Sequence, residues 1–404
     1  MNQQSFTKPF YIFFLVLPYG ISIGFITVTL PFVLTNKGFS VAEVAGIVSL
    51  GLSANIWRFF WGPLADLTLS LKKWYWIGVT ACVSTLILLC FIPFKIQNIT
   101  LITGVVFLSQ VAATFVVLPV GGIMAKRIEE NKKGSAGGWY QAGNLGGMGL
   151  GGGAGLWLTT HYNVALAGVV LGLGSLLCAL FVIFIKDVYS EKNENIFVSL
   201  NVMLKDVVSM LRIPIVIFVM LLFCMPIGTG AASNLWSSIA ADWKADADTV
   251  ALVTGILSGI ISAIGCVIGG FIADKFGNWW AYLGAGFLCA LITILMALLP
   301  YHPMTYVAGV LAYAFVLGLI NAAFTSLALY ATGKKAAATK YSLLSSIANI
   351  PVVYMTAFDG WAHDLKGSKY MLVTEALAAV VFIALSIVVL KKMSQRNLVP
   401  AGIE

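Results

Sequence analysis

The sequence predicts an all-α integral membrane protein with twelve transmembrane helices in two six-helix halves. Three observations lead to this fold class. The 404 residues are 60% hydrophobic and only 10% charged, whereas a soluble domain carries roughly 25% charged residues. The chain contains repeated apolar runs near the ~20 residues that cross a bilayer. A short loop motif also recurs about half a chain apart, as in duplicated membrane bundles.

Short polar connections separate the apolar runs. The first run is too long for the apolar core of a cleavable signal peptide, so we expect it to stay as a membrane span. The twelve spans are expected at about residues 10–34, 41–64, 74–94, 99–124, 136–159, 163–186, 212–239, 249–273, 279–300, 303–330, 340–362 and 369–390.

The longest polar connection, residues 187–211, divides the chain into an N-terminal half (1–186) and a C-terminal half with a short tail (212–404). Apolar residues recur at helical spacing in the second part of this connection. We therefore expect an amphipathic helix that lies on the inner membrane surface.

Most of the 24 Lys and Arg residues fall in alternate loops, on the side of the N-terminus. Since positive loops stay in the cytoplasm, we expect both termini to be cytoplasmic, in a multi-pass protein of the cytoplasmic (inner) membrane. The same pattern explains the net charge of +8 without nucleic acid, because no basic stripe with interleaved aromatic residues is present.

Glycines recur every four residues in the fifth span, at Gly143, Gly147, Gly151 and Gly155. Such a small face lets membrane helices approach closely. Static packing and a sliding interface between two halves are both compatible with this pattern.

Several stretches together resemble a known family. The twelve spans and the repeated loop (Trp57 to Asp66, and Gly269 to Asp274) are similar to the major facilitator superfamily. Trp57 to Asp66, Ala322 to Leu327, Ala338 to Ser346 and the glycine-rich fifth span further resemble the AmpG-type muropeptide permeases and the related acetyl-CoA transporters. The resemblance implies two halves that rock around a central site, in a transporter that works by alternating access.

The resemblance places the repeated loops at the inner side of the protein. We expect Asp66 and Asp274 to brace neighbouring helix ends there, with Lys72, Lys73 and Lys275 beside them. These residues are gating candidates rather than substrate ligands, since such a brace must open when the cavity faces inward.

Polar and aromatic residues inside spans are candidate ligands, because they are costly in lipid unless they meet partners or water. Arg58 is the one basic residue placed within a span, where an ion pair, snorkelling or an anion contact would accommodate it. The neutral set favours a neutral or zwitterionic solute. The substrate-binding candidates are Tyr19, Asn55, Arg58, Gln110, Tyr140, Gln141, Asn144, Asn234, Trp236, Tyr313, Asn321, Asn349 and Tyr354.

Glu375 is the only carboxylate well inside a predicted span. It is the candidate for coupling to protons, with a structural role as the alternative. Asp359, His363 and Asp364 cluster near the predicted outer end of the eleventh span, as an outer-gate ion pair or a solvated turn.

We therefore predict a monomeric secondary transporter for a small-to-medium organic solute, such as a muropeptide or a siderophore, driven by protons. The AmpG-type branch typically carries acidic residues on its fourth and seventh helices, where this chain is neutral at Gln110 to Thr114 and at Gly228 to Ala232. An uncoupled facilitator or exporter is thus the alternative, followed by a membrane sensor and a polytopic membrane enzyme. No catalytic constellation, metal-ligand spacing or cofactor motif is expected, since the six cysteines and three histidines form no such set.

Overall fold

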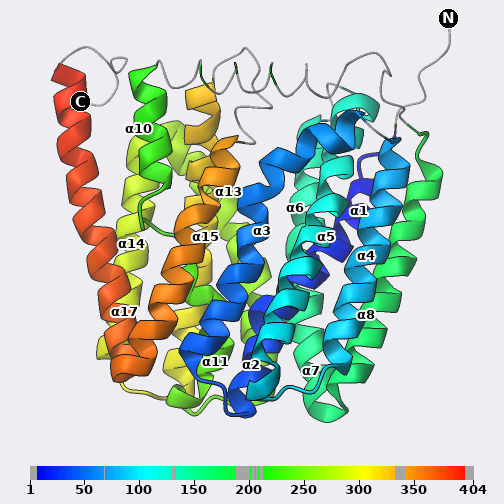
Figure 1. Cartoon of the computed structure of the whole chain (residues 1–404). Coiled ribbons are helices and arrows are strands. Elements are labelled where there is room, and N and C mark those ends of the chain that lie inside the picture. Colours follow the sequence, from blue (N-terminus) through cyan, green and yellow to red (C-terminus); the bar gives the residue numbers. More distant parts are fainter. Residues whose placement is uncertain are drawn as a thin grey trace, which may run out of the picture. The chain divides into compact units, whose positions relative to one another are not determined.

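The computed structural model describes residues 7–67, 69–129, 133–187, 213–332 and 343–395, together with residues 201, 205 and 208. All regular elements among these residues are helical, which confirms the predicted fold class (Figure 1). Nine of the described helices are long and apolar enough to cross a membrane. Most of residues 187–211, where the amphipathic helix is predicted, and most of the stretch 338–346 lie outside the described residues.

Three further predicted spans are present but do not appear as separate long apolar helices. Residues 133–161 are helical, as α6 (Lys133–Gly149), η4 (Leu150–Ala154) and α7 (Gly155–His161), but their many glycines lower the hydropathy. The last two spans run together in α17 (Asn349–Gln395), whose backbone leaves the helical region only at Lys366 and Gly367. The seventh span is interrupted, as described below.

The chain divides into two compact units. The first comprises Met1–Phe39, Leu50–Ser199 and Ala247–Gly259, and the second comprises Ser40–Ser49, Leu200–Asp246 and Ile260–Glu404. The predicted halves supply most of each unit. The start of α3 (Val41–Leu67), however, belongs to the second unit, and the helical segment from Ala247 to Gly259 belongs to the first.

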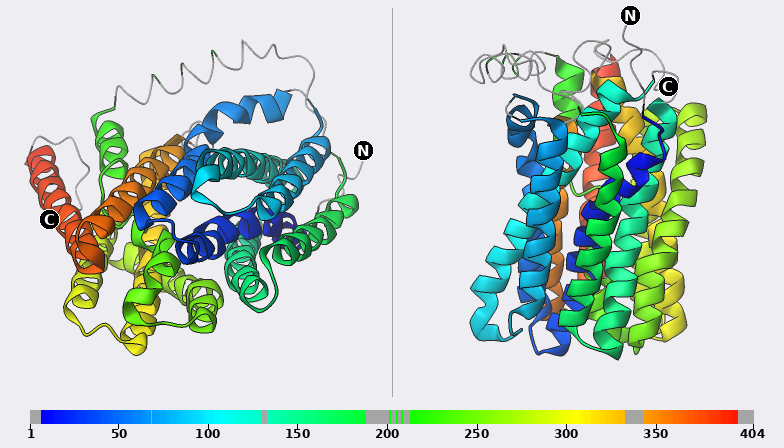
Figure 2. Two further views of the ribbon diagram at one scale, coloured as in Figure 1. Left: turned by 60° about the horizontal axis from the view of Figure 1, so that its bottom comes forward. Right: turned by 90° about the vertical axis from the view of Figure 1, so that its right-hand side faces the viewer.

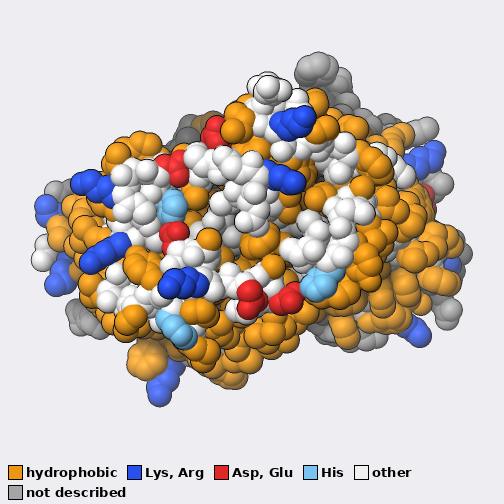
Figure 3. Space-filling view, turned by 90° about the horizontal axis from the view of Figure 1, so that it is seen from below, with side chains coloured by type: hydrophobic (Ala, Val, Ile, Leu, Met, Phe, Trp, Pro, Cys, Tyr) orange, Lys and Arg blue, Asp and Glu red, His pale blue; other side chains and the backbone are white. Residues whose placement is uncertain are grey.

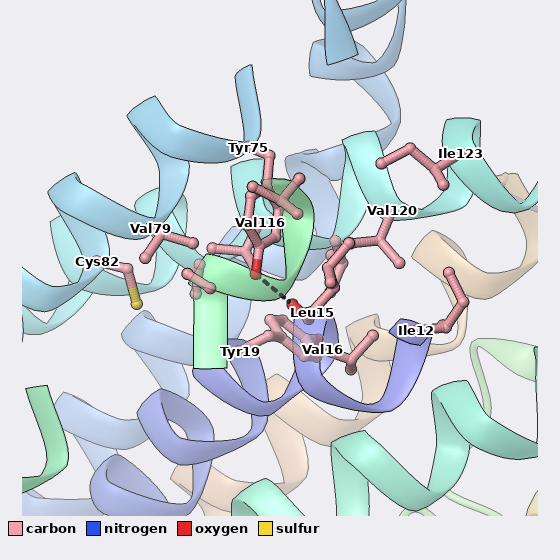
Figure 4. Close-up of a cluster of buried hydrophobic side chains, with 14 of the residues drawn as sticks. Ile12, Leu15, Val16, Tyr19, Tyr75, Val79, Cys82, Val116, Val120 and Ile123 are labelled. Atoms are coloured by element: carbon pink, nitrogen blue, oxygen red, sulfur yellow. Dashed lines mark hydrogen bonds between the residues drawn. The ribbon is translucent and has the colours of Figure 1, made fainter. Parts of the chain in front are cut away.

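The first unit is built on helices that pack side by side along their lengths (Figures 1 and 2). They are α1 (Tyr11–Gly24), α4 (Leu71–Phe91), α5 (Ile99–Arg127), α6 and α8 (Val164–Ala179). Their shared core is apolar, as Figure 4 shows for side chains from α1, α4 and α5. The buried Tyr75 hydroxyl lies within this core, where it donates a hydrogen bond of 3.0 Å to the Leu15 carbonyl oxygen.

The predicted glycine face packs α6 and η4 directly onto α1. A Cβ atom on Gly143 or Gly151 would overlap the carbonyl oxygen of Phe13 or Ile21, respectively. A Cβ atom on Gly147 would lie 2.6 Å from the Leu17 carbonyl oxygen. These contacts lie inside one unit, so at these three positions the glycines serve close helix packing.

The second unit is organised around α14 (Asn278–Leu298), which packs against both α15 (Pro303–Thr332) and α17. Another helix, α13 (Ser258–Phe276), approaches α15 closely through two glycines. A Cβ atom on Gly265 would overlap the Phe315 carbonyl oxygen, and one on Gly318 would overlap that of Ser262.

Candidate functional site

The seventh span is a broken helix. It starts as α10 (Pro214–Phe223), loses helical structure from Cys224 to Gly230, and resumes as the short turns η6 (Ala231–Asn234) and α11 (Trp236–Ile239). The sequence explains the break, because Gly228 and Gly230 both have positive φ (+58° and +75°), a conformation that L side chains rarely adopt. Irregular backbone at membrane depth is tolerated where protein or water covers it, and it often marks binding sites. The predicted continuous helix over 212–239 is therefore wrong at this point.

Glu375 lies against this broken helix. Its side chain, 7% exposed, accepts a hydrogen bond of 3.0 Å from the Tyr313 hydroxyl at Oε1 and a further bond from the backbone N–H of Ala232. The Oε2 atom is buried without a partner among the described residues. Glu375 thus connects α15 and the second part of α17 to the resumed helix η6.

A second buried carboxyl group lies in the first part of α17. Asp359 is 0% exposed and interacts electrostatically with Glu375. Neither of its oxygens has a hydrogen-bond partner among the described residues. The expectation that Asp359 belongs with His363 and Asp364 is therefore wrong, since Asp359 lies one helical turn deeper in α17 and is fully buried. Two buried carboxyl groups that interact in this way cannot both ionise without a large electrostatic cost.

Neutral polar and aromatic residues complete this cluster. The Asn234 side-chain amide donates a hydrogen bond of 3.0 Å to Thr356 Oγ1, which links the broken helix to α17. The Trp236 ring is 2% exposed and packs edge-to-face on Tyr313, with 5.3 Å between ring centroids. The structure thus brings Asn234, Trp236, Tyr313 and Glu375 together, all of which the sequence singled out.

A small pocket opens beside Glu375. It is lined by the non-helical backbone of the seventh span and by α14 and α17, including Pro226, Thr229, Cys289 and Thr293. A larger pocket lies among α13, α14 and α15, but its lining side chains are apolar. The smaller pocket is therefore the better candidate for polar chemistry.

In the first unit, the structure pairs several of the predicted polar residues. The Tyr19 hydroxyl donates a hydrogen bond of 3.1 Å to Asn55 Oδ1, and Gln110 Nε2 donates one of 2.9 Å to Ser22 Oγ. Arg58 is partly buried and interacts electrostatically with Tyr19. These contacts join α1, α3 and α5 through buried hydrogen bonds.

The other predicted ligands lie in different surroundings. Tyr140 packs against the apolar core of the first unit, and Gln141 is exposed. Asn144 is half-buried, with its Oδ1 atom unpartnered among the described residues.

The remaining predicted ligands belong to the second unit. Asn321 is exposed there, whereas Asn349 donates a hydrogen bond to the Ser345 carbonyl oxygen. The Tyr354 hydroxyl donates one of 2.8 Å to the Cys224 carbonyl oxygen, at the start of the break in the seventh span.

The gating candidates are mostly exposed. Asp274, Lys275 and Lys73 are exposed, and Lys72 is half-buried. The Asp66 side chain lies outside the described residues. At the start of α4, Asp187 accepts a hydrogen bond of 3.3 Å from the backbone N–H of Lys72. A lone Asp after the sixth span gave no sequence signal for this contact.

His363 forms an ion pair with Asp242, with 2.9 Å between Nε2 and Oδ2, and Ser368 also hydrogen-bonds Asp242. Burial by itself raises the pKa of Asp242, but the hydrogen bonds from His363 and Ser368 and the nearby imidazole outweigh it and lower that pKa. In the first unit, His161 lies 3.9 Å from Asp248. Figure 3 shows histidine (pale blue) next to acidic (red) side chains on the lower face of the molecule.

The family model of the Major Facilitator Superfamily matches residues 12–356. The chain belongs to the Major Facilitator Superfamily. This membership agrees with the twelve-helix fold and identifies a membrane transporter.

Solved structures of superfamily transporters have the same fold. The nucleoside transporter NupG matches with a TM-score of 0.73 at 13% sequence identity, over 94% of this chain and 98% of that one. A POT family transporter in complex with 5-aminolevulinic acid matches with a TM-score of 0.71 at 12% identity, over 94% and 95%. Another POT family transporter, in complex with a thioalcohol-conjugated peptide, matches with a TM-score of 0.72 at 12% sequence identity, over 95% of this chain and 96% of that one. Comparison with curated protein sequences finds no match.

Proposed function

We propose that this superfamily member is a proton-coupled secondary transporter of a small-to-medium organic solute, working by alternating access in the cytoplasmic membrane. One observation carries the coupling: the buried carboxyl group of Glu375, bonded to Tyr313 and to the backbone of the broken seventh span. An intramembrane acid is costly unless it serves a pathway for ions or protons. Because Glu375 bonds to the backbone of the broken seventh span, a change in the charge of Glu375 would act on this irregular segment.

The polar residues of the two units support an organic solute with few net charges. The Tyr19–Asn55 and Gln110–Ser22 pairs of the first unit are neutral donors and acceptors, with Arg58 beside Tyr19. Asn234, Trp236 and Tyr354 offer similar groups in the second unit. The structural neighbours are described with an amino acid derivative, a peptide conjugate or a nucleoside function. Muropeptides and siderophores, which carry amide and hydroxyl groups, are solutes of similar chemistry. A muropeptide substrate would also agree with the proposed place of this chain in the AmpG-type branch.

We further propose that residues 1–186 and 212–404 rock as two halves with both termini in the cytoplasm. In this proposal Asp66 and Asp274, with Lys72, Lys73 and Lys275, brace the inner side. The exposed Asp274 and Lys275 then act only in a state in which that side is closed.

An uncoupled facilitator or exporter is the second candidate. It is favoured by the neutral side chains at the two positions where the related branch carries acids. Gln110 of the fourth span is hydrogen-bonded to Ser22 and Ser109, with no acid in that cluster among the described residues.

Uptake into proteoliposomes separates the two candidates. Substrates are first sought by thermal stabilisation of purified protein with panels of muropeptide fragments, siderophores, dipeptides and nucleosides. A stabilising compound is then supplied in radiolabelled form with and without an imposed pH gradient. We expect accumulation above equilibrium only with the gradient, and we expect Glu375→Gln to reduce uptake to simple equilibration. Glu43→Gln is the matched control, because the half-buried Glu43 bonds locally, to the Ser40 backbone N–H at the start of α3. Equal uptake with and without the gradient would favour the uncoupled candidate.

A further inference from the structure

The two buried acids of the second unit differ in their hydrogen bonds. Glu375 Oε1 accepts a bond from the Tyr313 hydroxyl, and the Ala232 N–H donates to the same carboxyl group. Asp359 receives no donor at either oxygen among the described residues, although it is the more deeply buried of the two. One acid is thus solvated by the protein and the other is not.

This difference decides where a single negative charge is stable. Hydrogen-bond donors stabilise an ionised carboxylate, whereas burial without donors favours the neutral acid. Since two interacting buried carboxyl groups resist double ionisation, the pair holds at least one proton for as long as both groups stay buried. Glu375 has the donors for the charge, and Asp359 has none.

The surroundings of the pair supply no positive charge among the described residues. The titratable groups that interact with it are Tyr313 from α15 and Cys289 from α14, both of which are neutral in their ordinary forms. Asn234 and Thr356 bond to each other. His363, one turn from Asp359 on α17, is engaged with Asp242.

We propose that Asp359, rather than Glu375, holds the transported proton. In this proposal Glu375 carries the negative charge that attracts this proton, and the hydrogen bonds of Glu375 respond to whether the proton is bound. This inference rests on the proposed function. Loading converts the Asp359 carboxylate and a hydronium ion into a carboxylic acid and water. Release returns the proton to water in a state in which Asp359 is exposed to water on the other side, so that both carboxyl groups can then be ionised. When Asp359 is ionised, its charge repels Glu375 and weakens the bond to Ala232. Proton release thereby loosens the resumed part of the seventh span, η6, which also carries the substrate candidate Asn234.

The proton is located by infrared titration of the full-length protein in lipid nanodiscs, through the carbonyl-stretch band of a protonated carboxyl group. We expect this band at neutral pH in the wild type and in Glu375→Gln, where its midpoint moves to lower pH because the negative neighbour is gone. We expect its loss in Asp359→Asn, while Asp248→Asn, an exposed carboxylate, leaves it unchanged. A band that survives Asp359→Asn and disappears in Glu375→Gln would overturn the assignment.

Two further arms keep the test decisive. If Asp359→Asn does not fold, Asp359→Glu keeps a carboxyl group, and its band must titrate at a different midpoint from that of the wild type. An unchanged midpoint contradicts the proposal. Titrations in sodium and in potassium chloride test a metal ion as the occupant, since a band removed by sodium at constant pH rules out the proton.

Transport measurements separate this inference from the proposed function. In proteoliposomes, Asp359→Asn should lose accumulation driven by the pH gradient while retaining equilibration of substrate. If the pH gradient still drives accumulation in Asp359→Asn, this inference alone is wrong. If the pH gradient drives no accumulation in the wild type, both the proposed function and this inference are wrong.

Discussion

The carboxylate of Asp364 accepts a hydrogen bond of 3.0 Å from the backbone N–H of Val41, and its second oxygen accepts one of 3.0 Å from Ala42. Asp364 lies in α17, and the two N–H groups belong to the first turn of α3, where no intrahelical acceptor exists. The helices also touch through Gly360, where a Cβ atom would overlap that of Ala45. All these residues belong to the second unit, so the start of α3 is fixed to α17.

Asp364→Ala is expected to destabilise this junction. Removing a helix-capping side chain costs about 0.5–2 kcal/mol, and here two backbone donors lose their acceptor. The midpoint of thermal unfolding in detergent should fall, while Asp364→Asn, which keeps one acceptor oxygen, should have a smaller effect. An unchanged midpoint in both variants would show that the bond contributes nothing to stability. If the protein alternates in access as proposed, weakening of the junction should also speed labelling of a cysteine placed at Ala45.

The His363–Asp242 pair predicts a pH dependence of stability. The pKa of Asp242 is lowered in the folded state by its bonds to His363 and Ser368, so the charged form is favoured by folding. Its contribution is present above the ordinary Asp pKa of about 3.9 and is lost as the pH falls through the lower folded value. Thermal midpoints measured from pH 6 downward should therefore decline more steeply in the wild type than in Asp242→Asn. Parallel curves would exclude this linkage.

Gly151→Ala tests the close packing of η4 on α1. The added Cβ would overlap the Ile21 carbonyl oxygen, and overpacking of this kind costs about 1–3 kcal/mol. Gly174→Ala, in α8 of the same unit, adds a Cβ with nothing within 4 Å and is the matched control. We expect a lower thermal midpoint for the first variant only. Equal midpoints would mean that α1 and η4 separate at little cost, as in a sliding interface.

Tyr75→Phe removes a buried hydroxyl group from the apolar core shown in Figure 4. Its bond to Leu15 is buried, and a buried hydrogen bond contributes about 0.5–1.5 kcal/mol. The variant should unfold at a lower temperature than the wild type. Tyr162→Phe, at a side chain that is 62% exposed, should unfold like the wild type. A loss of stability in the control alone would contradict the role assigned to Tyr75.

Much of the candidate site was predictable from residue type alone. Polar side chains inside apolar runs are unusual because they are costly in lipid. The structure places four of them in one cluster: Glu375, Tyr313, Asn234 and Trp236. The break in the seventh span was also signalled, by Pro226 and the two glycines at 228 and 230, but the apolar residues around them favoured a continuous helix.

Residue types alone predict twelve membrane spans, because a bilayer demands ~20 apolar residues per helix and tolerates few charges. Which polar residues meet is seen only in the folded chain. It joins Asp359 to Glu375 across 16 positions, leaves Asp364 to cap α3, and gives Asp187 the capping contact on α4. Such pairings depend on helix rotation and depth, which similar apolar runs leave open because many packings bury the same surface.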